Sequence, residues 1–70
     1  MLLTSGLAQQ LQVAVLQRTN RQIRDLAIEV DPSRIILLGE AHTYHAKQLA
    51  QESVRSILPH LPLVNRIRVA

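Results

Sequence analysis

The sequence predicts one small α+β domain in which two helices pack on one face of a three-stranded sheet, in the order α-β-β-α-β. Apolar residues recur every three or four positions in two segments, which is typical of helices, and at every second position in two others, which is typical of strands. A fifth segment is continuously aliphatic. The 70 residues suffice for a single domain over 1–70, and one layer of helices over one sheet buries every apolar stripe.

The first helix is expected over Ser5–Arg18, with Ser5 as its N-cap. Glutamines line one side of this segment, and apolar residues at helical spacing line the other. The apolar residues are Leu7, Leu11, Ala14 and Val15. Thr19 and Asn20 compete for backbone hydrogen bonds, so we expect them to end the helix.

The middle of the chain predicts two antiparallel strands joined by a turn. Leu26–Val30 alternates apolar and polar residues, and Ile35–Ala41 is aliphatic and β-branched. Asp31–Arg34 between them fits a type I turn, because Asp favours its first position and Pro its second. Gly39 interrupts the second strand, which indicates a bulge, a bend or a close helix contact there.

A second helix and a third strand complete the domain. Thr43 is the expected N-cap, and Pro59 and Pro62 prevent the helix from continuing. The apolar stripe of this helix consists of Ala46, Leu49, Ala50, Ser53, Val54, Ile57 and Leu58. Leu63–Val69 alternates again, which predicts a strand with Asn65 as a polar exception on its core face. The core residues of this strand are expected to be Leu63, Ile67 and Val69.

The composition favours a binding module over an enzyme. The chain has no cysteine and only two glycines, so it lacks both a thiolate metal site and a phosphate-cradling glycine loop. No Ser-His-Asp set stands in a motif context, and we expect neither a catalytic residue nor a cofactor. Met1–Gly6 lacks the features of a secretory signal, and no run reaches the ~20 apolar residues of a membrane span.

His42 and His45 stand three positions apart, a spacing that can place two imidazoles on one helix face for a metal ion. Two such ligands without a third carboxylate or thiolate are a weak signal for zinc. The favoured interpretation is that both are solvated histidines near the helix start, and no metal site is expected.

Alternation along the second strand predicts a docking surface. If Ile35 and Leu37 face the helices, then Ile36 and Leu38 point to the opposite face, which two helices on one side leave open. The last strand adds arginines beside them. The predicted binding surface consists of Ile36, Leu38, Arg66 and Arg68. Two alternatives would remove it: a shifted strand register, or the N-terminal segment 1–3 folding over the aliphatic residues.

Several ligands suit such a surface. Basic groups beside exposed aliphatics fit an anionic phospholipid surface, and the net charge of +3 agrees with that partner, although it is also ordinary for a small soluble domain. A partner protein or a second copy would equally cover the aliphatic patch. The arginines could instead pair with Asp25 and Glu29. Nucleic acid is disfavoured, because Tyr44 is the only aromatic residue available for stacking on bases.

Residues 22–69 resemble the BON domain family of bacterial osmotic-stress and nodulation proteins. Leu26–Val30 looks like the first strand of that family. Arg34–Ala41 is similar to its strand "gly-val-val-x-leu-x-gly-x-val", with Gly39 as the second glycine, and Val64–Val69 is similar to its last strand. An alanine-rich helix lies between them, as in the family. The turn at 32–34 and the loop at 59–62 depart from the glycine-containing family pattern.

The resemblance implies a non-enzymatic module. BON domains occur in osmotic-stress proteins, secretion channels and other envelope components, and are associated with attachment to phospholipid surfaces and with protein contacts. The resemblance therefore implies a periplasmic or envelope location and either a lipid or a protein partner. A structural dimerisation domain without a ligand and a weak binder of nucleic-acid backbones are the alternative functions.

Overall fold

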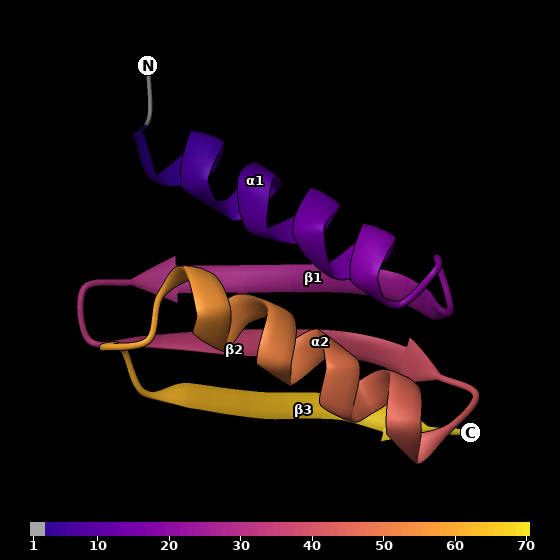
Figure 1. Ribbon diagram of the computed structural model, residues 1–70. Coiled ribbons are helices and arrows are strands. Elements are labelled where there is room, and N and C mark those ends of the chain that lie inside the picture. The colour runs from indigo at the N-terminus through magenta and orange to yellow at the C-terminus, as the bar shows by residue number, and fades with distance from the viewer. Residues whose placement is uncertain (1–2) are drawn as a thin grey trace.

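The computed structural model describes residues 3–70, with side chains described from Gly6 onward, and it confirms the predicted α-β-β-α-β order (Figure 1). The elements are α1 (Leu3–Arg18), β1 (Ile23–Asp31), β2 (Arg34–Ala41), α2 (Tyr44–Ile57) and β3 (Leu63–Val69). The strands form one mixed sheet in the order β1-β2-β3, with β1 antiparallel and β3 parallel to β2.

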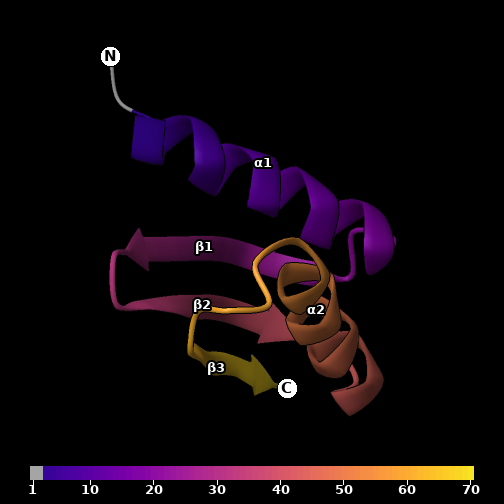
Figure 2. The ribbon, with the colours of Figure 1, turned by 60° about the vertical axis from the view of Figure 1, so that its left-hand side comes forward.

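Both helices lie on the same side of the sheet, as the two views of the ribbon show (Figure 1, Figure 2). Helix α2 packs on β2 and β3, and α1 packs on β1 and α2. The fully buried side chains from all of these elements form one core. Its members are Leu11, Val15, Ile23, Ile35, Leu37, Ala41, Ala46, Ala50, Val54 and Ile67. The small side chains of Ala46 and Ala50 on α2 leave room for the helix to approach the sheet closely.

Helix α1 begins two residues before the predicted start, so Ser5 lies inside its first turn and the prediction of Ser5 as N-cap is wrong. The predicted end is confirmed. Thr19 is buried, and its hydroxyl donates to the carbonyl oxygen of Val15 at 2.7 Å. Asn20 and Arg21 then take φ angles of 57° and 59°, a left-handed conformation that turns the chain out of the helix.

Strand β1 begins at Ile23, three residues before the predicted start. Its first residues were not recognised as a strand because a β-bulge interrupts the alternation of apolar and polar residues. Arg24 pairs with Glu40 and Ala27 with Leu38, so two residues of β1 lie opposite Gly39 alone. The bulged residue Asp25 has a φ of 54°. Gly39 has a φ of 148°, and a Cβ atom there would stand 2.9 Å from the carbonyl oxygen of Arg24. Of the three alternatives expected at Gly39, the structure shows a bulge, and its extra residue lies in the facing strand β1.

The β1–β2 connection is a two-residue turn held by Asp31. Its Oδ1 atom accepts from the Ser33 backbone N–H at 2.8 Å, the Ser33 hydroxyl at 2.8 Å and the Arg34 N–H at 2.9 Å. These hydrogen bonds, that of the Ser33 hydroxyl first, lower the pKa of Asp31.

Helix α2 starts as predicted, because Thr43 Oγ1 accepts from the Ala46 N–H at 3.1 Å. Two residues expected in the core are largely outside it. Ile57 is 40% exposed in the last turn of α2, and Val69 is 45% exposed at the end of β3. Ile67 is fully buried as expected.

Candidate docking surface on the open face of the sheet

The side chains of β2 alternate between two environments. Ile35 and Leu37 are fully buried under the helices, so Ile36 and Leu38 point to the opposite side of the sheet. No described segment crosses that side in either view of the ribbon (Figure 1, Figure 2). We call it the open face. The alternative in which the strand register is shifted is therefore wrong, whereas Met1 and Leu2 and the side chain of Leu3 lie outside the described residues.

Strand register arranges the open face in three complete rows across the sheet, because directly paired residues point to the same side. The rows, each running from β1 through β2 to β3, are Glu29–Ile36–Val64, Ala27–Leu38–Arg66 and Arg24–Glu40–Arg68. One further pair, Asp31 with Arg34, closes the face at the turn.

An aliphatic patch occupies the centre of this face. Ile36, Leu38 and Val64 are half-buried, and Ala27 is exposed. The structure thus brings all four predicted residues to one surface, with Arg66 directly beside Leu38 and Arg68 one row further along. Ala27 and Val64 were missed by the sequence analysis. Val64 carried a detectable signal, because it shares the period-two positions of Arg66 and Arg68.

Arg68 is engaged within the chain. Its Nη2 atom lies 2.7 Å from Glu40 Oε2, and the carboxylate side chain is 34% exposed. The hydrogen bond and the positive charge of Arg68 lower the pKa of Glu40, with smaller effects from Arg24 and His42. The alternative pairing of the arginines with Asp25 or Glu29 is not found among the described residues. Such an exposed pair adds little stability, but it neutralises one of the predicted binding arginines.

The charges in the two rows that hold the aliphatic patch have opposite signs on opposite flanks. Glu29 lies on the β1 flank and Arg66 on the β3 flank, and neither forms an ion pair within residues 6–70. In total, the strand residues on this side of the sheet include four arginines and three carboxylates. They are Arg24, Arg34, Arg66 and Arg68 against Glu29, Asp31 and Glu40. The open face is therefore an aliphatic centre with a mixed-charge rim.

His42 and His45 are both exposed at the start of α2. Within the part of the chain that the structure describes, no group of three His, Cys, Asp or Glu side chains is placed to hold a metal ion. The two histidines are assigned no ligand role.

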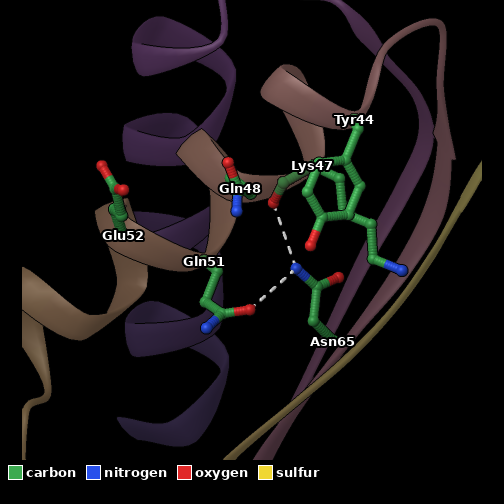
Figure 3. Close-up of a pocket in the computed structure, with 6 residues that line it drawn as sticks. All are labelled: Tyr44, Lys47, Gln48, Gln51, Glu52 and Asn65. Atoms are coloured by element: carbon green, nitrogen blue, oxygen red, sulfur yellow. Dashed lines mark hydrogen bonds between the residues drawn. The ribbon is translucent and has the colours of Figure 1, made fainter.

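A small pocket of about 140 Å³ lies on the helix side, between α2 and β3, and it too was missed by the sequence analysis (Figure 3). Its lining residues are Tyr44, Lys47, Gln48, Gln51, Glu52 and Asn65. The Asn65 amide donates to the Lys47 carbonyl oxygen at 3.1 Å and to Gln51 Oε1 at 3.3 Å, while its own oxygen accepts from the Ile67 N–H at 3.1 Å. The Asn65 side chain thus links β3 to α2 by hydrogen bonds, which explains why a polar residue occupies the core face of β3.

The helices of the described chain are too short or too polar to cross a membrane. Comparison with protein-family models, with curated proteins and with solved structures finds no match to this chain.

Proposed function

We propose that this chain is a non-catalytic binding module of the BON type that docks a partner protein on its open face. The observation that carries the proposal is the aliphatic patch of Ala27, Ile36, Leu38 and Val64, which no described segment covers. An apolar patch that solvent can reach, surrounded by a polar rim, is typical of protein contact surfaces.

The charges of the rim favour a protein over an anionic lipid surface. Membrane attraction grows with uncompensated basic residues, by ~1 kcal/mol for each one near the surface. On the open face, Glu40 engages Arg68 and the Asp31 carboxylate stands beside Arg34, while Glu29 would meet lipid phosphates unfavourably. A protein surface can match both signs of charge at once, whereas a uniformly anionic surface matches only one.

Nucleic acid is supported less well. Stacking on bases needs aromatic side chains, and the sole aromatic residue, Tyr44, lies at the start of α2 on the helix side. The arginines of the open face surround aliphatic residues, which contribute nothing to base stacking.

Site-specific photo-crosslinking in cells that make the protein tests this proposal. A photoreactive residue replaces Ala27 on the open face, and a control places it at Gln48, which is exposed on α2. We expect discrete protein adducts from position 27 that are absent from position 48. Leu38→Lys should abolish them, and Arg66→Glu, at an exposed position where folding is not at risk, should weaken them. The absence of adducts at position 27, or adducts insensitive to both substitutions, would overturn the proposal.

Vesicle co-sedimentation tests whether the open face binds an anionic lipid surface instead of a protein. The protein is mixed with phosphatidylcholine vesicles with and without phosphatidylglycerol, at low and physiological salt. We expect no binding that depends on the anionic lipid at physiological salt. Anionic-lipid binding that is lost in Leu38→Lys would instead assign the open face to a membrane surface.

A further inference from the structure

The geometry points to one kind of occupant for the open face: a single amphipathic helix of the partner protein, lying along β2, with basic residues on one flank and acidic residues on the other. This inference rests on the proposed function and specifies its partner. Three properties of the face carry it, namely its dimensions, its unsuitability for a second copy, and the charges on its two flanks.

The dimensions of the open face match one helix. Strands stand ~4.8 Å apart, so the outer strands of a three-stranded sheet are separated by about 10 Å, which is the diameter of one helix with its side chains. Along β2, the open face extends about 20 Å from Arg34 to Glu40 at ~3.3 Å per residue. This length corresponds to about 14 residues of helix. A helix of four turns would therefore cover the aliphatic patch from end to end.

The same dimensions disfavour a second copy of this chain. The face offers roughly 200–300 Å², whereas a stable interface of standard size buries about 800 Å² on each partner. Charge opposes the copy as well. A two-fold axis along β2 would set β1 of one copy over β3 of the other, so that Arg24 would meet Arg68. A two-fold axis across the strands at Leu38 would set Arg66 over Arg66 and Ile36 over Glu40, against one favourable pair of Glu29 with Arg24.

Charge on the flanks specifies the helix further. Glu29 beside Ile36 and Arg66 beside Leu38 stand on opposite sides of the central strand. Neither has an ion-pair partner among the side chains that the structure describes. A helix whose apolar stripe rests on Ile36 and Leu38 presents its flanking positions to these two charges. Lysine or arginine suits the flank above β1 where it passes Glu29 and Asp31, two carboxylates that outnumber Arg24 on that strand, and aspartate or glutamate suits the flank above β3.

Binding of designed helical peptides to the isotope-labelled protein, followed by NMR, tests the inference. Each peptide has about 20 residues, which is long enough to be helical, and carries the same aliphatic stripe at helical spacing. One has lysines on one flank and glutamates on the other. Two controls carry lysine on both flanks or glutamate on both flanks. The area predicts weak binding of the mixed peptide, with a Kd on the order of 100 μM.

We expect the mixed peptide to shift the resonances of Ile36, Leu38 and Val64, and to bind about three- to tenfold more tightly than either control, since each exposed charge pair adds little. Arg66→Glu should weaken the mixed peptide and strengthen the all-lysine peptide. Leu38→Lys should remove binding of all three.

Two outcomes overturn the helix inference while leaving the proposed function intact. One is equal binding of all three peptides at the open face, and the other is no peptide binding there while crosslinked adducts from position 27 persist. Concentration-dependent shifts of the same residues without any peptide would assign the face to a second copy and overturn the inference. Absence of both peptide binding and crosslinking would refute the proposed function itself.

Discussion

Replacing Gly39 with alanine should destabilise the domain severely, because its backbone conformation and its surroundings both exclude a side chain. The φ of 148° is a conformation that L residues rarely adopt, and holding a non-glycine residue in such a region costs about 1–3 kcal/mol. The added Cβ would stand 2.9 Å from a backbone oxygen of Arg24 and 3.1 Å from Ile23 Cγ2. Backbone cannot yield as a flexible side-chain end would, so overpacking adds a further ~1–3 kcal/mol.

The combined loss of about 2–6 kcal/mol is large against the whole stability of the domain. At ~0.05–0.15 kcal/mol per residue, a chain of 70 residues unfolds with roughly 3.5–10 kcal/mol. Urea denaturation followed by far-UV circular dichroism measures the difference. With a denaturant slope of about 1 kcal/mol per molar, the midpoint should fall by about 2 M or more, and part of the population should be unfolded without urea.

The other glycine supplies a matched control. Gly6 lies in α1, and a Cβ there would meet nothing within 4 Å. Gly6→Ala should leave the domain as stable or stabilise it by about 0.5–1 kcal/mol, since alanine favours the helix. If Gly39→Ala unfolds at the same urea concentration as the natural sequence while Gly6→Ala behaves as expected, the bulge and the close backbone approach are wrong.

Three further predictions concern polar contacts. Asn65→Ala removes the two amide hydrogen bonds that tie α2 to β3 and the acceptor of the Ile67 N–H, and should lower the free energy of unfolding by about 1–3 kcal/mol in urea titrations; no loss would mean that water replaces these hydrogen bonds. Thr43→Ala removes the N-cap of α2 and should cost ~1 kcal/mol, with Thr43→Ser close to the natural stability. Arg68 lowers the pKa of Glu40, so this ion pair contributes to the free energy of unfolding. Its contribution is fully present above the ordinary pKa of glutamate and is lost as the pH falls through the lower pKa that Glu40 has in the folded protein. Arg68→Gln should return the Glu40 pKa, read from its carboxyl carbon, toward the ordinary value; an unchanged midpoint would show that the pair does not form in solution.

Much of the fold follows from local patterns, and the errors lie where tertiary contacts decide. The spacing of Leu11 and Val15 and the alternation in β3 placed these elements correctly, because each carries its own periodicity. The start of β1 could not be predicted from alternation. The bulge at Asp25 puts Ile23 and Leu26 on the same face at an odd spacing, which breaks the period of two.

The candidate site was predictable in part. Alternation alone placed Ile36 and Leu38 opposite the buried side of β2. The neighbours of these residues depend on cross-strand register, which local sequence does not encode, so Ala27 and the ion pair of Arg68 with Glu40 were missed. The same limit applies to Asn65. Its position on the core face was predicted from alternation, but its hydrogen-bond partners on α2 were not, because they lie 14 and 18 residues away in the sequence.

The proposed docking surface requires that no part of the chain itself covers the open face, and a soluble gadolinium chelate tests this directly. The chelate broadens the NMR signals of methyl groups that solvent can approach. In dilute protein, the methyl signals of Ile36, Leu38 and Val64 should relax much faster with the chelate present, while those of Ile35 and Leu37 should change little. Equal protection of both sets would contradict the account, since the proposed docking surface would then already be occupied.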